Sequence, residues 1–294
     1  MYQGTIAGFE AVQVPGDGVE ISALVGGEGP PLLLLHGYPQ TRMIWAEVAQ
    51  AFREDFTLVI PDLRGYGRSE KPRGDIGHHA YSKRQMGQDQ LATMRYLGFN
   101  RFSVAGHDRG ARVAYRLALD TPEAVEKLCV MDIIPTSDMW LFGPPAIMGL
   151  FQWTFLAQPE PLPEMLLEGR GREFMTLLFE RWSMPGFSFE PNAMNDYLTS
   201  NTTPDSIHAS CEDYRAGWHV DRIHDEEDRQ TGRRLSQPLL VLWGQEGAAH
   251  KAAPLEIWRN WADDLQGHAV SGGHFVPEEA ASEVVEHLRK FLKS

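Results

Sequence analysis

Cysteine is scarce in this chain. Its 294 residues include only two, Cys129 and Cys211. Two cysteines cannot build the disulfide framework of a small secreted domain, so we expect a reducing compartment and a cytoplasmic protein. Cys129 lies in an apolar run, and neither cysteine has an obvious activating base beside it in the sequence. The sequence therefore gives no support for a thiol nucleophile.

The chain also lacks long apolar runs and a basic leader. Its first residues, MYQGTIAGFEAV, contain no basic segment followed by an apolar stretch. No apolar run approaches the roughly 20 residues that span a bilayer. We therefore expect no membrane association.

Clusters of basic residues are missing as well. Lys and Arg number 27 against 40 Asp and Glu, which gives a net charge of −13. Nucleic acid is not expected as a partner, because phosphate binding needs a basic face. An anionic ligand would also be repelled at long range, so any site for one must gather cations locally.

What the sequence does contain is an alternation of short β-rich runs with helical patterns. The composition, 43% hydrophobic and 23% charged, fits a packed globular protein. Such alternation predicts an α/β fold with a mostly parallel sheet flanked by helices. The expected strands are 31–36, 56–62, 102–107, 127–134, 238–244 and 267–271, and the expected helices are 85–97, 111–119 and 278–292.

The strand pattern is interrupted after Pro135 by a stretch rich in Pro, Met, Trp and Phe. We interpret 136–225 as a helical cap inserted between two parts of one core, 1–135 and 226–294. The charged segment 221–234 is expected to be a solvated connection without a function of its own.

The sharpest local signal is Gly-His-Asp-Arg-Gly at 106–110, which follows an apolar strand and precedes a helical pattern. Small residues on both sides of Asp108 are typical of a nucleophile elbow, a sharp turn that exposes its central side chain at the carboxyl end of the sheet. A carboxylate at this position can displace a leaving group from an sp³ carbon and form an ester, whereas serine would attack a carbonyl. Asp108 is therefore the candidate nucleophile.

A second polar segment, His36-Gly37-Tyr38-Pro39, follows the strand sequence PLLLL. This is where an elbow-containing fold places a backbone N–H that stabilises an oxyanion, and we assign the donors to the N–H groups of Tyr38 and Arg109. The Tyr38 side chain either lines the cleft or packs against it. His36 is expected to make structural hydrogen bonds.

The general base is expected near the C-terminus, where Ser-Gly-Gly-His-Phe at 271–275 follows a predicted strand, so His274 is the candidate. Its orienting acid is either Asp132, at the end of the strand LCVMD, or Glu246, after LLVLWG. We favour Asp132, because an Asp at the mouth of an apolar strand is costly unless it is paired.

Two arginines lie close to the nucleophile, Arg109 directly after it and Arg112 one helical turn further on. They either compensate the charge of Asp108 or bind the carboxylate of a substrate through bidentate contacts. The net negative charge of the protein favours the second hypothesis, that the arginines bind a substrate carboxylate.

Taken together, the segments HGYPQ, DLRGYGRS, GHDRGAR, VMDIIPT, QWTFLAQPEP, EDYRAG and GGHF resemble the haloacetate (fluoroacetate) dehalogenases of the α/β-hydrolase family, nearly end to end. The resemblance implies an α/β-hydrolase fold and hydrolytic dehalogenation of a short 2-haloacid through an aspartyl ester, giving the 2-hydroxyacid and halide without metal or cofactor. It places Arg109 and Arg112 on the substrate carboxylate.

The same resemblance implies that two cap residues, Trp153 and Tyr214, donate hydrogen bonds to the departing halide. The chain departs from the family at Gln152, where these dehalogenases usually have histidine. Fluoride needs every available donor because the C–F bond is strong, so this departure makes chloride or bromide the expected better leaving group.

Two other functions stay open. An epoxide hydrolase would use the same nucleophile and base but needs cap hydroxyls, for which Tyr214 and Tyr197 are the candidates. A non-catalytic receptor for a small anion would need no nucleophile, base and acid together. The sequence also leaves open whether the chain forms a homodimer.

Overall fold

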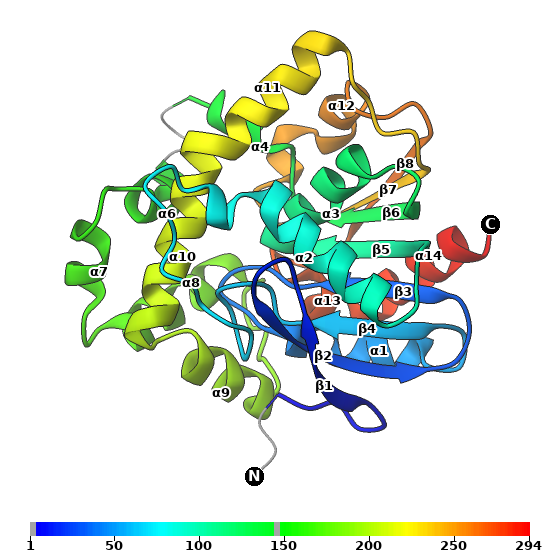
Figure 1. The fold of residues 1–294 in the computed structure, drawn as a ribbon, viewed down its shortest axis with the longest axis horizontal. Coiled ribbons are helices and arrows are strands. Elements are labelled where there is room, and N and C mark those ends of the chain that lie inside the picture. Colours follow the sequence, from blue (N-terminus) through cyan, green and yellow to red (C-terminus); the bar gives the residue numbers. More distant parts are fainter. Residues whose placement is uncertain (1–3, 144–147) are drawn as a thin grey trace.

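The computed structural model describes residues 4–143 and 148–294, and within them an eight-stranded sheet forms the centre of the molecule (Figure 1). The strand order is β1-β2-β4-β3-β5-β6-β7-β8. From β4 to β8 neighbouring strands are parallel, whereas β1 and β2 add an antiparallel edge. The strands are β1 (Glu10–Pro15), β2 (Glu20–Gly27), β3 (Pro31–Leu35), β4 (Thr57–Pro61), β5 (Phe102–His107), β6 (Val125–Met131), β7 (Leu239–Gly244) and β8 (Leu265–Val270).

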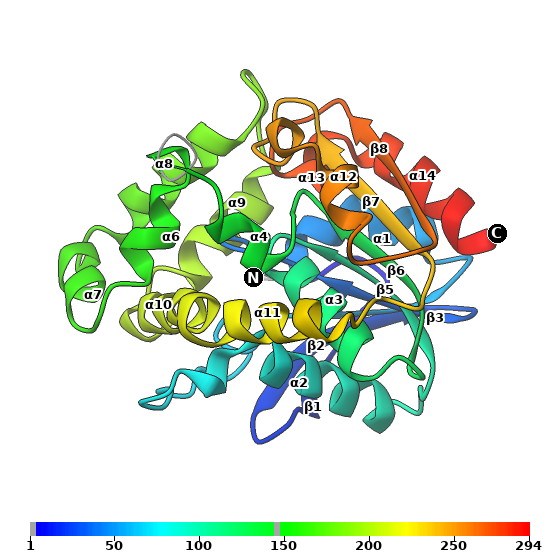
Figure 2. The ribbon, with the colours of Figure 1, turned by 90° about the horizontal axis from the view of Figure 1, so that it is seen from above.

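Helices cover both faces of this sheet, α2 and α3 on one side and α1 and α14 on the other (Figure 2). This explains why β3 and β5 are buried along nearly their whole length, because a parallel strand covered on both faces has no solvent side. The core helices are α1 (Ala46–Phe52), α2 (Lys83–Tyr96), α3 (Arg109–Asp120), α12 (Pro254–Trp258), α13 (Val276–Glu279) and α14 (Ala281–Lys293), with short 3₁₀ turns η1 (Arg42–Trp45), η2 (His79–Tyr81) and η4 (His250–Ala252).

Between β6 and β7 the described chain is helical, as the sequence predicts. In Figure 1 the middle helices of this insertion gather at one end of the sheet. The division into cap and core at 135 and 225 stays a prediction, and residues 144–147 of the predicted cap lie outside the described chain. The helices are α4 (Thr136–Trp140), α6 (Phe151–Leu156), α7 (Leu162–Leu167), α8 (Gly171–Trp182), α9 (Pro191–Ser200), α10 (Pro204–Ala216), the π-helical turn η3 (Gly217–Asp221) and α11 (Arg222–Thr231).

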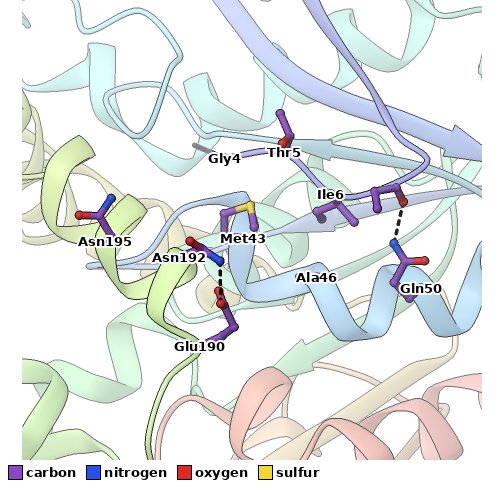
Figure 3. Close-up of a pocket in the computed structure, with 10 residues that line it drawn as sticks. Gly4, Thr5, Ile6, Met43, Ala46, Gln50, Glu190, Asn192 and Asn195 are labelled. Carbon is purple, nitrogen blue, oxygen red and sulfur yellow. Dashed lines mark hydrogen bonds between the residues drawn. The ribbon is translucent and has the colours of Figure 1, made fainter. Parts of the chain in front are cut away.

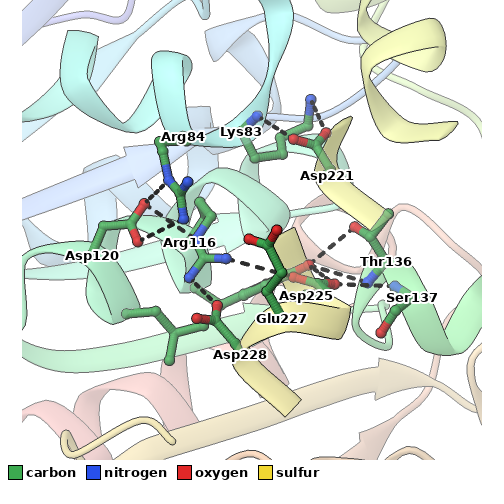
Figure 4. A network of polar contacts seen from close by, with 12 residues as sticks. Lys83, Arg84, Arg116, Asp120, Thr136, Ser137, Asp221, Asp225, Glu227 and Asp228 are labelled. Carbon is green, nitrogen blue, oxygen red and sulfur yellow. Dashed lines mark hydrogen bonds and ion pairs between the residues drawn. The ribbon is translucent and has the colours of Figure 1, made fainter. Parts of the chain in front are cut away.

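The expectation that 221–234 is a solvated connection holds only in part, because most of its residues are exposed but three of its acids are buried. Most of it is the helix α11, and its Asp225 and Asp228 side chains are buried. Both form ion pairs with Arg116 of α3, which is itself buried, and Asp225 also accepts a hydrogen bond from the Tyr115 hydroxyl (Figure 4). The carboxylates of this segment therefore bind it to the core, because burying a guanidinium without a nearby carboxylate costs free energy.

No helix in the described ranges is both long enough and apolar enough to cross a bilayer.

Candidate active site

The turn between β5 and α3 has the geometry of a nucleophile elbow. Asp108 adopts φ +47° and ψ −118°, a strained conformation for a residue with a side chain. A Cβ on Gly106 would lie 2.6 Å from the backbone N of Ala111, and one on Gly110 would overlap the carbonyls at the end of β3. The small residues are thus required by the close approach of strand, turn and helix, and Asp108 is held where the sequence predicts.

One oxygen of the Asp108 carboxylate accepts a backbone hydrogen bond, and the other accepts none in the described chain. Its Oδ1 accepts a hydrogen bond of 2.8 Å from the backbone N–H of Tyr38, on the segment after β3. Its Oδ2 lies 3.8 Å from Nε2 of His274. Burial alone would raise the pKa of Asp108, but the charges of His274, Arg109 and Arg112 lower it overall. The carboxylate is therefore ionised and has one oxygen available for attack.

His274 is oriented by Asp132. Its Nδ1 lies 2.6 Å from Oδ2 of Asp132, whose Oδ1 accepts the backbone N–H of Gly244. Burial opposes protonation of His274, but the hydrogen bond and charge of Asp132, together with the charge of Asp108, raise its pKa above the ordinary value. Glu246, the other candidate acid, is exposed, and its backbone N–H bonds to Gly272. The geometry thus brings Asp108, His274 and Asp132 together.

Arg109 is occupied by a partner that the sequence analysis did not identify. Its Nε and one terminal nitrogen donate to the carboxylate of Asp213 at 3.1 and 2.6 Å, and the same nitrogen donates to the Asp213 carbonyl. Asp213 also pairs with the buried ammonium of Lys83 and accepts the Tyr66 hydroxyl. The charge of Arg109 is therefore balanced by Asp213 of α10. Its remaining nitrogen, Nη1, is buried without a partner among the described residues.

Arg112, unlike Arg109, has no carboxylate partner among the described residues. One of its terminal nitrogens donates to the carbonyl of Ile134 and to the Thr136 hydroxyl, each at 3.0 Å. Across residues 4–143 and 148–294 it forms no ion pair with a carboxylate, and its Nε is buried without a partner. Arg112 is only 2% exposed, and burying a guanidinium without a carboxylate to balance its charge costs free energy. The positive charge of Arg112 is therefore not balanced by an ion pair within the described chain.

The aromatic residues proposed for the halide lie directly over these arginines. The Trp153 ring stands 4.6 Å from the Arg112 guanidinium and 5.3 Å from that of Arg109, and the Tyr214 ring stands 4.4 Å from Arg109. Trp153 and Tyr214 meet edge to face, with ring centroids 5.8 Å apart. Burial and the charge of Asp108 raise the pKa of Tyr214, so its hydroxyl stays protonated and able to donate.

The Tyr38 ring belongs to the same group, since it contacts the Tyr214 ring edge to face at 5.4 Å. Its hydroxyl is buried and has no hydrogen-bond partner in the described chain. Gln152 is also buried, with an amide oxygen that likewise has no described partner, but no hydrogen bond places it against Trp153 or Tyr214. The orientation of Gln152 toward the site is thus the least supported of the predicted features.

His36, as expected, makes structural hydrogen bonds. Its Nδ1 pairs with the Gly37 carbonyl, and its Nε2 accepts the backbone N–H of Leu63.

A hollow of about 570 Å³ elsewhere on the molecule lies between the N-terminal segment, α1 and α9, with Met43, Gln50 and Asn195 in its lining (Figure 3). It contains none of the proposed catalytic residues, and we assign it no role.

Residues 30–281 match the family described as alpha/beta hydrolase fold. The chain belongs to the α/β-hydrolase family. The predicted fold class is thereby confirmed.

The individual relatives of this chain include a dehalogenase and an epoxide hydrolase. A fluoroacetate dehalogenase from Burkholderia sp is 39% identical over 288 residues, covering 97% of this chain and 94% of that protein. A soluble epoxide hydrolase from Corynebacterium sp. (strain C12) is 32% identical over 284 residues, covering 94% of each. A solved structure from Nostoc sp PCC 7120, provisionally named an α/β hydrolase, superposes with a TM-score of 0.94 at 42% identity, covering 97% of this chain and 98% of that one. This α/β hydrolase is thus related both to a dehalogenase and to epoxide hydrolases.

Proposed function

We propose that this α/β hydrolase removes halide from haloacetate or a similar short 2-haloacid by hydrolysis. The observation that carries the proposal is Arg112, a buried guanidinium beside the nucleophile with no carboxylate partner among the described residues. A substrate carboxylate supplies the missing charge and accepts paired hydrogen bonds in the geometry that guanidinium favours. Nη1 of Arg109 supplies a further donor.

The first step is displacement at the α-carbon. Oδ2 of Asp108 attacks the carbon that bears the halogen, the carbon–halogen bond breaks, and its electron pair leaves with the halide. The product is an ester between Asp108 and the 2-position of the acid. Trp153 Nε1–H and the Tyr214 hydroxyl donate to the halide as its charge develops, which stabilises the transition state more than the ground state.

The second step is hydrolysis of that ester. His274 takes a proton from water, and the oxygen attacks the Asp108 carbonyl carbon while Asp132 stabilises the imidazolium. The Tyr38 N–H already points at Oδ1 of Asp108, where the negative charge of the tetrahedral intermediate develops. Collapse releases the 2-hydroxyacid and restores the carboxylate. The sum is 2-haloacid plus water to 2-hydroxyacid, halide and a proton.

The epoxide hydrolase alternative draws on the relationship to the Corynebacterium enzyme. It requires cap hydroxyls that protonate the epoxide oxygen, and Tyr197 was one candidate. The Tyr197 hydroxyl instead donates to Glu278 at 2.9 Å, which leaves Tyr214 alone in that role. A neutral epoxide also leaves the charge of Arg112 unanswered, so we favour the dehalogenase.

The deciding experiment measures both products on one preparation. Purified protein is incubated with fluoro-, chloro- and bromoacetate and, separately, with an aliphatic and an aryl epoxide. We expect halide and glycolate from at least chloro- and bromoacetate, in equal amounts, and no diol above background. Diol formation without halide release would make the epoxide hydrolase assignment correct.

Substitution of Arg112 tests the substrate class. We expect Arg112→Leu to lower kcat/KM for chloroacetate roughly 10- to 150-fold, equivalent to about 1.5–3 kcal/mol for hydrogen bonds to a charged group. Loss of this cation removes an unbalanced buried charge but leaves the Ile134 carbonyl without its donor, so we expect a loss of about 1–2 kcal/mol in urea unfolding.

Arg109→Leu is the matched comparison. It strips Asp213 of its main partner, so we expect a loss of stability on the order of 3 kcal/mol in addition to weaker substrate binding. An unchanged kcat/KM in Arg112→Leu would exclude Arg112 from substrate binding.

The halogen preference rests on Gln152. We expect wild type to release chloride from chloroacetate faster than fluoride from fluoroacetate. In Gln152→His a protonated imidazole would donate a charge-assisted hydrogen bond to nascent fluoride, so the ratio of fluoride to chloride release should rise by about tenfold or more, or about 1.4 kcal/mol. Gln158→His, at an exposed position after the same helix, serves as control. A ratio that stays level or falls would mean that Gln152 does not face the halide.

A further inference from the structure

The loop that carries His274 is held by a carboxylate outside the catalytic group, Glu279 of α13. Its Oε2 accepts the backbone N–H of Gly273 at 2.9 Å, and its Oε1 accepts that of Phe275 at 2.7 Å. These are the two residues on either side of His274. Glu279 therefore fixes the backbone from which the imidazole projects.

The same carboxylate reaches into the inserted helical region. Oε2 of Glu279 also accepts the N–H of Met184 at 2.6 Å, just after α8. The His274 N–H donates to the Trp182 carbonyl at 2.8 Å. A Cβ on Gly273 would lie 2.6 Å from both the Met184 N and the Trp182 O, so the two backbones are in direct contact there.

On its other side the loop is held by β5. Nε2 of His107, the residue before the nucleophile, lies 2.7 Å from the His274 carbonyl, and the two imidazoles are 4.7 Å apart. Burial lowers the pKa of His107 to about 3, so it stays neutral and donates this hydrogen bond as an N–H. Both backbone polar groups of His274 are thus bonded, one to the insertion and one to β5.

We propose that Glu279 is a positioning residue for ester hydrolysis, because it joins the backbone N–H groups beside His274 to that of Met184 and so sets the imidazole between Asp132 and Asp108. The inference rests on the proposed function and adds a residue to it. Three hydrogen bonds to an ionised acceptor are strong, and removing the acceptor leaves half-buried N–H groups unsatisfied. A small displacement of a catalytic base is enough to cost about 100-fold in rate.

Glu279 also influences His274 through charge. The groups that face the imidazole are Asp132, Asp108, Glu279 and the neutral His107, with the uncharged Trp182 ring edge-on from α8. Burial lowers the pKa of His274, and the three carboxylates raise it. Removal of the Glu279 charge is therefore expected to lower that pKa.

The test separates the two chemical steps. In Glu279→Gln one oxygen becomes an NH₂ group, which cannot accept a hydrogen bond. We expect ester formation with chloroacetate, followed as the rate of the first halide equivalent, to stay within about twofold of wild type. Ester hydrolysis should slow by roughly 10- to 100-fold, so that the Asp108 adduct accumulates during turnover. Glu286→Gln, on the exposed face of α14, is the control and should behave as wild type in both steps.

Glu279→Asp distinguishes position from charge. It keeps the charge, but its shorter side chain cannot reach all three N–H groups, so we expect slow hydrolysis with the pKa of His274 close to wild type. Full recovery of hydrolysis in this variant would overturn the positioning role, as would wild-type hydrolysis in Glu279→Gln.

An NMR measurement made without substrate tests the effect of Glu279 on His274 separately from the proposed function. The imidazole resonances of His274, titrated by NMR, should show a lower pKa in Glu279→Gln and a loss of the low-field Nδ1–H signal shared with Asp132. Unchanged resonances would overturn the inference even if no haloacid is turned over. Absence of halide release from haloacetates in wild type would instead contradict the proposed function alone.

Discussion

Asp108→Asn will release no halide above background in the steady state. An amide cannot form the ester, and loss of a covalent nucleophile lowers kcat by roughly 10⁶-fold in enzymes of comparable design. The substitution preserves size, and Asn tolerates the positive φ that Asp108 adopts, so the elbow should keep its conformation. Halide release from chloroacetate, measured by ion chromatography over hours, is the readout.

Two controls make this result interpretable. Asp263→Asn, an acid-to-amide change on the exposed surface, should retain full activity. Intact-mass analysis before and after the assay must show no conversion of the amide back to acid, since that reaction would restore the nucleophile. Steady-state halide release from a preparation free of such conversion would rule out Asp108 as the nucleophile.

The elbow was predictable because it is local. The apolar strand, the small residues around Asp108 and the following helix are contiguous in the chain, so the steric requirement is written in a few neighbouring positions. The position of His274 was predictable for a related reason, since the fold places the base after the last strand and the chain offers His274 between Gly273 and Phe275 there. What the sequence could not supply is the distance between these segments.

The arginines illustrate where sequence reasoning ends. Arg109 and Arg112 look alike in the sequence, one turn apart on the same helix. The structure separates them, because Asp213, which lies 104 residues further along the chain, pairs with Arg109 and leaves Arg112 without a described carboxylate. The signal in the sequence was Asp213 itself, an acid directly before Tyr214 in the segment EDYRAG. Nothing in the neighbouring sequence indicates which of the two arginines it pairs with.

The prediction for the charged segment 221–234 was incomplete for the same reason. A dense mixture of acidic and basic residues is usually a solvated surface. Here Arg116, on a core helix more than a hundred residues earlier, is buried beneath α11 and needs the carboxylates of Asp225 and Asp228. Likewise, the contacts of Glu279 are with backbone N–H groups, which carry no side-chain signature in a sequence.

His274→Asn separates alkylation from hydrolysis. The nucleophile is Oδ2 of Asp108, which lies 3.8 Å from the imidazole and needs no base, so ester formation should continue. Water activation requires the imidazole and its pairing with Asp132, which an amide cannot replace. We therefore expect one equivalent of halide per active site, and no further turnover.

The adduct gives the direct evidence. With chloroacetate, intact mass should rise by one carboxymethyl group, and peptide mapping should place it on Asp108. His268→Asn, an exposed histidine on β8, should show wild-type turnover and no stable adduct.

The pH dependence of the burst provides a second check on the same variant. Burial raises the pKa of Asp108, and the charge of His274 is the largest of the influences that lower it. Without that charge the pKa of Asp108 rises, so the nucleophile becomes protonated at a higher pH than in wild type. The burst rate should then be close to wild type at pH about 8 and decline earlier on acidification. A variant that forms no adduct at any pH would place His274 in the first step, and one that turns over at the wild-type rate would remove it from the mechanism.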